Sequence, residues 1–254
     1  MQKTNSISGN KNMYIRVFYL SVDCFFITLN KTQLVMKRIL FLLYIALISI
    51  SVNAQDTETK VLIITNMGKI TIKLYNETPQ HRDNFIKLVQ ENKYDSIMFH
   101  RVIKQFMIQA GEKYAPNDSI HSASYKALDY KIPAEFVYPK YYHKRGQLGA
   151  AREGDKENPE RASSASQFYI VTGKHFTDNE LDKKIKEANI TLTPEQREAY
   201  KIEGGAPHLD GSYTIFGEVI KGMKVVQKIE LTTIDDTDRP LKDVRIKTMK
   251  ILKK

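Results

Sequence analysis

FHRVIKQFMIQAGE, residues 99–112, is the stretch that decides the fold of this chain. Apolar and polar residues alternate along it, which is typical of short strands with one buried face. One arginine, Arg101, lies among these apolar residues. Strand alternation places Arg101 on the same face as Phe99 and Ile103. The next strand supplies the neighbours Phe106, Met107 and Gln109. The pattern therefore predicts a hairpin in which a guanidinium group and an amide border an apolar basin.

Further strands and two helices are expected on either side of this hairpin. Residues 60–75, KVLIITNMGKITIKLY, form two β-rich runs around an Asn-Met-Gly turn. Residues 78–94 predict a helix, with Thr78 as its N-cap and Pro79 at its first position. Later segments predict two strands, a short amphipathic helix and a closing strand, at 166–173, 211–220, 222–229 and 243–252. Many short strands and few helices predict a mainly β fold, a closed antiparallel barrel.

One charged segment, about residues 177–203, interrupts this pattern. Thr177 with Glu180, and Thr193 with Gln196, have the spacing of capping boxes, which satisfy the free N–H groups at a helix start. The first of the two predicted helices has an apolar face formed by Leu181, Ile185 and Ala188. The segment is therefore expected to be a helical hairpin inserted between two strands. It leads into His208 and Leu209, so we expect it beside the mouth of the apolar basin.

Residues 36–55, MKRILFLLYIALISISVNAQ, have the layout of a secretory signal peptide. Two basic residues precede an apolar run that ends at a small-residue cleavage site, so the signal peptide is expected at 36–54. The apolar run is about 14 residues, short of the roughly 20 that a membrane-spanning helix needs. The prediction is a periplasmic or otherwise exported protein without stable membrane insertion once processed. An uncleaved N-terminal membrane anchor is the alternative.

Residues 1–35 precede a segment that ought to be terminal, so they are expected to be a mis-assigned extension. The only cysteine, Cys24, lies there, so the mature chain, residues 55–254, would be held together without disulfides. Residues 1–54 carry six basic residues and one acidic residue, which is half of the formal net charge of +10. The rest is dispersed over the mature chain. No basic cluster indicates nucleic-acid binding.

These segments resemble the cyclophilin-type peptidyl-prolyl isomerases. The similarity is carried by FHRVIKQFMIQAG (99–111), GQLGAAR (146–152), SQFYI (166–170) and HLDGSYTIFGEVIKGMKVV (208–226), in the order that the family has. With the hairpin TNMGKITIKLY (65–75), it covers nearly all of residues 60–253 apart from the insertion. The resemblance implies an eight-stranded antiparallel barrel closed by two helices, with a substrate groove on its outside.

The resemblance also implies which residues form the site. Arg101 matches the catalytic arginine of the family. The pocket for the proline ring is matched by Phe106, Met107, Tyr169 and Leu209. Polar groups at the groove are matched by Gln109 and Gln167, and the segment that pairs with the substrate backbone by Ala151 and Arg152. The remaining groove positions are matched by His100, His208 and Tyr213.

Several groove positions differ from the residues most common in the family. His208 stands where eukaryotic members often have tryptophan, and this loss of a large ring should weaken binding of cyclosporin-like ligands. At the other positions, Tyr213 stands for a frequent histidine and Arg152 for a frequent asparagine. Likewise, Tyr169 stands for a frequent phenylalanine and Ala110 for a frequent glycine. Because Arg101 and the apolar residues around it match the family, catalysis is expected to survive these changes.

The chemistry implied for Arg101 explains why a guanidinium belongs in an apolar hairpin. Rotation about an X-Pro bond breaks amide resonance, with a barrier of about 18–20 kcal/mol. In the twisted transition state the proline nitrogen regains a lone pair, to which a fixed guanidinium can donate a hydrogen bond. The alternative is an edge-strand arginine whose stem only covers its apolar neighbours.

The predicted function is therefore isomerisation of X-Pro bonds in unfolded or exported polypeptides, by a monomer without a cofactor. The six histidines show no i,i+4 pairing and have no accompanying cysteines, so no metal site is expected. A periplasmic chaperone that only holds proline-rich or unfolded chains is the rival hypothesis. The inserted hairpin motivates this rival, because it adjoins groove residues. An assay of X-Pro isomerisation separates the two.

Overall fold

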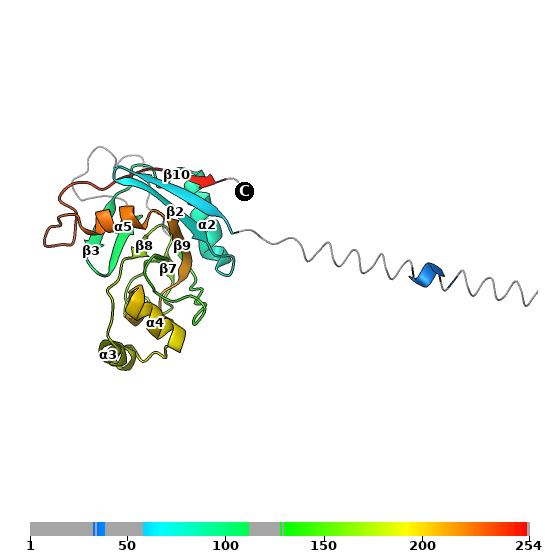
Figure 1. Cartoon of the computed structure of the whole chain (residues 1–254). Coiled ribbons are helices and arrows are strands. Elements are labelled where there is room, and N and C mark those ends of the chain that lie inside the picture. Colours follow the sequence, from blue (N-terminus) through cyan, green and yellow to red (C-terminus); the bar gives the residue numbers. More distant parts are fainter. Residues whose placement is uncertain (1–32, 34, 39–57, 112–127, 129, 253–254) are drawn as a thin grey trace, which may run out of the picture. The chain divides into compact units, whose positions relative to one another are not determined.

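The computed structural model describes residues 33, 35–38, 58–111, 128 and 130–252 (Figure 1). The chain divides into two units, Met1–Asp56 and Thr57–Lys254. In the first unit, residues 33 and 35–38 are helical. The rest of the predicted extension and signal peptide lies outside the described residues. Among the helices that are described, none has the length and apolar character that crossing a bilayer requires.

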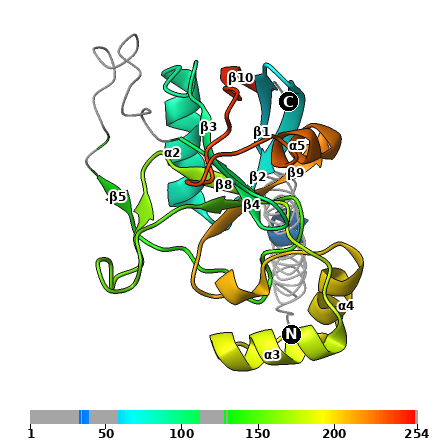
Figure 2. The ribbon, with the colours of Figure 1, turned by 90° about the vertical axis from the view of Figure 1, so that its left-hand side faces the viewer.

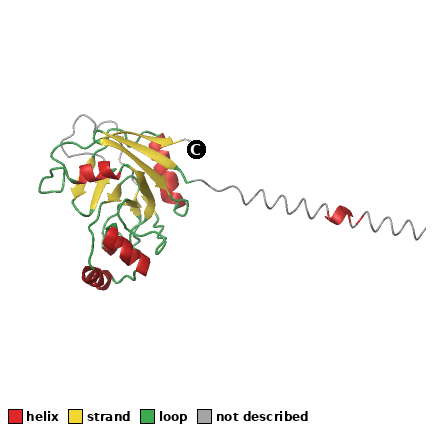
Figure 3. Ribbon diagram, viewed as in Figure 1, coloured by secondary structure: helices red, strands yellow, loops and turns green. Residues whose placement is uncertain are grey.

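The second unit is built on an eight-stranded antiparallel sheet with the strand order β10-β1-β2-β9-β6-β8-β4-β3. Figure 3 shows the strands in yellow and the helices in red. In chain order its strands are β1 (Lys60–Thr65), β2 (Gly68–Leu74), β3 (Phe99–Ile103), β4 (Met107–Ala110), β6 (Gln147–Ala150), β8 (Phe168–Val171), β9 (Ile215–Lys221) and β10 (Ile246–Leu252). A separate two-stranded sheet pairs β5 (Lys131–Ile132) with β7 (Ser163–Ser164). The prediction of a mainly β, eight-stranded antiparallel architecture is confirmed.

The sheet is curled, and its two edge strands are β3 and β10. Within the described residues these two strands do not pair with each other along their length. They are joined where they begin, by an isolated bridge between Met98 and Arg245 and by hydrogen bonds such as Phe99 N to Val244 O at 2.9 Å. The prediction of a closed barrel is therefore not confirmed, because regular pairing stops before the ring is complete.

Two helices pack on this sheet and share its core. They are α2 (Pro79–Gln90) and α5 (Met223–Glu230). The buried Phe85 of α2 and Val226 of α5 belong to the same apolar cluster as strand residues such as Ile70 and Ile108. Burial of this apolar stripe, which each helix needs, explains why both lie against the sheet. These are the two helices that the sequence predicts at 78–94 and 222–229.

The inserted segment folds as two helices, α3 (Asp178–Ala188) and α4 (Pro194–Ile202). Figures 1 and 2 show both at one end of the unit, away from α2 and α5. Both predicted capping boxes are present, at Thr177 and at Thr193. The helices bury a separate apolar cluster formed by Phe176, Leu181, Leu192 and Tyr200. The prediction of a helical hairpin in this segment is confirmed.

The hairpin of residues 99–112 differs from the prediction in one respect. The register of β3 against β4 shifts between Phe99 and Arg101. A bulge changes the face to which the following residues point, so Phe99 and Arg101 lie on opposite faces of the strand. Phe99 points into the main core and meets Phe168 edge-on, with 6.5 Å between ring centroids. Arg101 lies on the outer face, where Ile103 packs against Met107 and its neighbours. The prediction that Phe99 shares a face with Arg101 was wrong.

Candidate active site

A cavity of about 210 Å³ opens on the outer face of β3, β4 and β8. We call it the Arg101 cavity. It is lined by Arg101, Phe106, Met107, Gln109, Ala151, Arg152, Tyr169, Leu209 and Tyr213. All nine residues are among the twelve that the sequence predicts for the site, although they come from segments spread over more than a hundred positions. The structure therefore brings most of the predicted site into one hollow.

The floor of the Arg101 cavity is apolar and is formed by Met107, Tyr169 and Leu209, all of which are buried. Met107 and Tyr169 lie on β4 and β8, which pair antiparallel. Leu209 ends the short 3-10 helix η1 (Pro207–Leu209), and Phe106 comes from the turn before β4. Such a floor suits a small apolar ring, because it offers contact area without a competing hydrogen bond.

Arg101 borders this floor from the edge strand β3. It lies directly opposite Gln109 in the β3–β4 ladder, so both polar side chains stand at the same wall of the cavity. Its Nε donates to Asp238 Oδ2 over 3.3 Å, and its side chain is 46% exposed. Nε is therefore the guanidinium nitrogen that bonds to Asp238, and the side chain also lines the cavity. No pattern in the sequence indicated Asp238.

Arg152 is a second guanidinium at the Arg101 cavity, but it is firmly held. Its side chain is only 3% exposed and lies over the ring of Tyr213, 4.1 Å from the ring centroid. Its N–H groups donate to Ser212 O at 2.9 Å and to the Asp155 carboxylate at 2.7 Å. Because these donors are already used, Arg152 supports the ring of Tyr213 at the cavity wall.

Three of the predicted site residues lie elsewhere. Gln167 lines a neighbouring cavity, and its Oε1 accepts a hydrogen bond from Gln109 Nε2 at 2.8 Å. The exposed ring of His208 lies against Phe106, with centroids 5.2 Å apart, at the rim. His100 does not line the Arg101 cavity. Burial, together with the charges of Arg239 and Arg101, lowers the pKa of His100 to about 4.

Beneath the Arg101 cavity lies a buried histidine that the sequence did not single out. His143 Nε2 is 2.8 Å from the Tyr169 hydroxyl, and His143 Nδ1 is 2.9 Å from Asp210 Oδ1. His143 and Asp210 are far apart in the sequence and show no spacing that would pair them, so only the fold reveals their contact. We call Tyr200, Asp210, His143 and Tyr169 the His143 network, because Tyr200 also bonds to Asp210.

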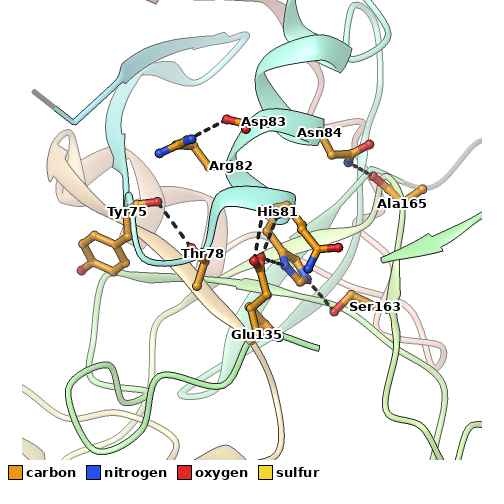
Figure 4. A network of polar contacts seen from close by, with 11 residues as sticks. Tyr75, Thr78, His81, Arg82, Asp83, Asn84, Glu135, Ser163 and Ala165 are labelled. Carbon is orange, nitrogen blue, oxygen red and sulfur yellow. Dashed lines mark hydrogen bonds and ion pairs between the residues drawn. The ribbon is translucent and has the colours of Figure 1, made fainter. Parts of the chain in front are cut away.

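A second buried histidine lies at the start of α2 and forms what we call the His81 network (Figure 4). His81 Nδ1 is 2.6 Å from Glu135 Oε2, and its Nε2 is 2.9 Å from Ser163 Oγ. A hydroxyl, an imidazole and a carboxylate in line also occur in nucleophilic enzymes. Here His81 and Ser163 are 2% and 1% exposed. A substrate therefore could not reach the hydroxyl, and the network is structural.

Glu135 also replaces the N-cap that the sequence predicts for α2. Thr78 occupies the N-cap position, but its side chain does not cap the helix. The carboxylate of Glu135 instead accepts hydrogen bonds from Gln80 N at 3.1 Å and from His81 N at 3.0 Å (Figure 4). A carboxylate at a helix N-terminus is favourable because it meets both free N–H groups and the helix dipole.

Groups of three or more His, Cys, Asp or Glu side chains that could hold a metal ion are absent from the described residues. What the Arg101 cavity offers is an apolar floor, one partly free guanidinium and amide groups. Such an arrangement can grip a small ring and donate a hydrogen bond beside it. It holds no aligned nucleophile and base.

Comparisons with known proteins point to one family. Residues 60–251 match the model of the cyclophilin type peptidyl-prolyl cis-trans isomerases. Relatives named for peptidyl-prolyl cis-trans isomerase occur in Staphylococcus epidermidis, at 32% identity, and Staphylococcus aureus, at 33%. Each alignment covers 78% of this chain and 93% of the relative.

Solved structures are similar as well. The crystal structure of a cyclophilin type peptidyl-prolyl cis-trans isomerase from Cryptosporidium parvum has a TM-score of 0.56 at 25% identity, and covers 78% of this chain and 99% of its own. A second crystal structure of that protein, determined in the presence of the dipeptide Ala-Pro, has a TM-score of 0.54 at 25% identity. It covers 77% of this chain and 99% of its own.

Proposed function

The chain belongs to the cyclophilin-type peptidyl-prolyl cis-trans isomerases, and from this membership we propose that it isomerises X-Pro bonds in the Arg101 cavity, with Arg101 as the catalytic residue. The proline ring rests on the apolar floor formed by Met107, Tyr169 and Leu209. The observation that supports this proposal is the placement of one partly free guanidinium at the wall of a ring-sized cavity with an apolar floor.

Arg101 acts on the state in which the amide is twisted. In the planar ground state the nitrogen lone pair is delocalised into the carbonyl group and is a poor acceptor. At the top of the barrier the nitrogen is pyramidal, and its lone pair becomes available to an N–H donor. A donor that is already fixed in place lowers the barrier, because it interacts with the transition state more strongly than with the substrate.

The residues around Arg101 hold the substrate while its chain rotates. The apolar floor immobilises the proline ring, so the segment before it must turn. Ala151 N already donates to Gln167 O at 3.0 Å, and Ala151 O accepts from Ser164 N at 2.8 Å. Pairing with the substrate backbone therefore falls to the main chain of Arg152. Gln109 faces the substrate from the wall of the Arg101 cavity, and Gln167, which lines the neighbouring cavity, holds it by a hydrogen bond.

An isomerase assay of the full chain tests this function. The wild-type protein should accelerate cis-to-trans conversion of an X-Pro tetrapeptide in a protease-coupled assay. Arg101→Ala removes the donor and should lower kcat/KM by about 100-fold, the usual effect of deleting one preorganised donor. Arg101→Lys keeps the charge without the planar fork and should stay closer to the alanine variant than to wild type. Wild-type turnover by Arg101→Ala would overturn the mechanism.

The proposed role is to assist folding of exported proteins, acting as a monomer on proline-containing chains. It depends on the signal peptide predicted at 36–54. N-terminal sequencing of the protein from its host should find a start at or near Gln55 in an exported fraction. A membrane-bound form that still carries residues 36–52 would favour the anchor. Size-exclusion chromatography with light scattering tests the monomer.

A further inference from the structure

The inserted hairpin is connected to the floor of the Arg101 cavity by an unbroken series of hydrogen bonds. Tyr200, on α4, donates to Asp210 Oδ2 at 2.6 Å. Asp210 Oδ1 lies 2.9 Å from His143 Nδ1, and His143 Nε2 lies 2.8 Å from the hydroxyl of Tyr169. Tyr169 lines the cavity, so the His143 network runs from the insertion to the surface on which the substrate ring would rest.

The hydrogen positions in this network follow from the acceptors. A carboxylate only accepts, so Asp210 takes hydrogens from the Tyr200 hydroxyl, from His143 Nδ1 and from the backbone N–H of His143 at 2.8 Å. In the tautomer that is protonated only at Nδ1, the imidazole offers its Nε2 lone pair. Tyr169 must then donate to Nε2. The polar hydrogen of Tyr169 therefore points away from the cavity.

Close packing leaves these side chains little freedom. The side chains of Asp210 and His143 are 0% and 1% exposed. A Cβ on Gly149 would lie 2.2 Å from Tyr169 Cζ, and a Cβ on Gly205 would lie 2.4 Å from the ring of Tyr200. Both tyrosines therefore fit only because glycine faces them. Buried polar groups packed in this way must keep their partners, since losing one leaves another unsatisfied.

We propose that Tyr200 and His143 are positioning residues for the isomerase: through Asp210 they hold the Tyr169 hydroxyl inside the protein, so that the insertion keeps the floor of the Arg101 cavity apolar. This rests on the proposed binding of a proline ring in that cavity. A proline ring offers no hydrogen-bond partner to a hydroxyl. A hydroxyl that has lost His143 as its partner would retain water at the floor of the cavity and weaken binding of the ring.

Tyr200→Phe tests the insertion's part, with Tyr138→Phe as the matched control. Tyr138 also ties the hairpin to the rest of the protein, through Thr191 O and the Gln196 side chain, but it makes no hydrogen bond to Asp210. We expect Tyr200→Phe to raise KM for an X-Pro peptide about fivefold, as the loss of one hydrogen bond allows, with kcat changed less than twofold. Tyr138→Phe should leave both constants within about twofold of wild type.

A double-mutant cycle between His143 and Tyr169 tests the route into the cavity. His143→Leu should raise KM about tenfold in the wild-type background, but less than about threefold when Tyr169→Phe is already present, because no hydroxyl is left to hold. A general loss of structure would raise KM in both backgrounds, so it would not produce a smaller effect of His143→Leu when Tyr169→Phe is present.

The outcomes separate this proposal from the proposed function. An unchanged KM in Tyr200→Phe, which removes a single oxygen atom, would overturn the role of the insertion. Equal effects of His143→Leu in both backgrounds would overturn the role of the hydroxyl. Absence of isomerase activity in the wild-type protein would instead overturn the proposed function, together with everything that rests on it.

Discussion

The His81 network and the His143 network have nearly the same design. In each, the Nδ1 of a buried histidine meets a carboxylate, its Nε2 meets a hydroxyl, and the carboxylate also accepts the backbone N–H of the same histidine. The two differ in where the hydroxyl lies. Ser163 is itself a residue of β7 and is buried, whereas Tyr169 forms part of the floor of the Arg101 cavity.

The comparison shows that such a network takes its role from its surroundings. Glu135 holds the N-terminus of α2, which contributes to the main core and only indirectly to the site. Asp210 joins the inserted hairpin to the segment that carries Leu209. The first network should therefore control stability alone, and the second should control both stability and the shape of the cavity.

Removing the charge of each carboxylate should give the largest effects and tests whether the two networks differ in their role. Asparagine and glutamine keep the shape of the side chain but introduce donors where only acceptors fit. Asp210→Asn and Glu135→Gln should each lower the free energy of unfolding by about 3 kcal/mol, because buried donors lose their acceptor. Only Asp210→Asn should also lower kcat/KM, by roughly tenfold.

Urea unfolding and the protease-coupled isomerase assay check this prediction, with activity measured where each variant is fully folded. A tenfold activity loss in Glu135→Gln would show that the His81 network also supports the site. Equal activity of Asp210→Asn and wild type would mean that the two networks do not differ.

Acid should weaken the fold. Burial lowers the pKa of His81, and burial with neighbouring arginines lowers that of His100 to about 4. Between pH 6.5 and about 4 the unfolded chain therefore binds more protons than the folded one. The free energy of unfolding should fall as the pH drops through this window, on the order of 2 kcal/mol for His100.

Urea titrations at pH 7.0 and 4.5 measure this loss. His100→Gln should reduce the difference between the two pH values, whereas the same change at the exposed His175 should leave it intact. A His100→Gln variant with the full wild-type difference would assign the acid sensitivity to other groups.

The smallest effect is expected at a third carboxylate, Asp238, which pairs with Arg101. Its ion pair with Arg101 is exposed on both sides, and such pairs contribute at most about 1 kcal/mol. Because Asp238 has a φ of 65°, glycine is the substitution that removes the carboxylate without straining the backbone. Asp238→Gly should lower kcat two- to fivefold and leave KM unchanged, since it frees Arg101 to move.

The matched control is Asp236→Gly, two residues away on an exposed position of the same loop. It should leave the kinetic constants at wild-type values. An unaltered kcat in Asp238→Gly would show that β3 alone orients the guanidinium.

Much of the fold could be read from local patterns. Hairpin turns and alternation locate most of the strands, and helix-start signals with the helical spacing of apolar residues locate the helices α2 to α5, because each signal lies within a few residues of the element that it sets. The bulge after Phe99 could not be predicted, since nothing in FHRVI indicates which residue is the extra one. The incomplete pairing of β3 with β10 could not be predicted either, because it depends on contacts between residues about 140 positions apart in the sequence.

The site divides in the same way. The lining of the Arg101 cavity follows from motifs that resemble the family, whereas His143 and Asp238 lie outside those motifs and Asp210 lies within one without a predicted role. Each becomes informative only once the fold places it beside Tyr169 or Arg101. His100 shows the converse. Its match to a groove position is clear in the sequence, yet the structure leaves it outside the cavity lining.

The central claim is that Arg101 acts on the twisted amide and contributes little to binding of the planar one. NMR exchange spectroscopy on an X-Pro peptide in the presence of the full chain measures the isomerisation rate on the enzyme and the Kd of the peptide separately. For Arg101→Ala we predict an exchange rate about 100-fold lower, with Kd within about threefold of wild type. An exchange rate equal to that of wild type, or a Kd raised by the same factor as the rate is lowered, would contradict the account.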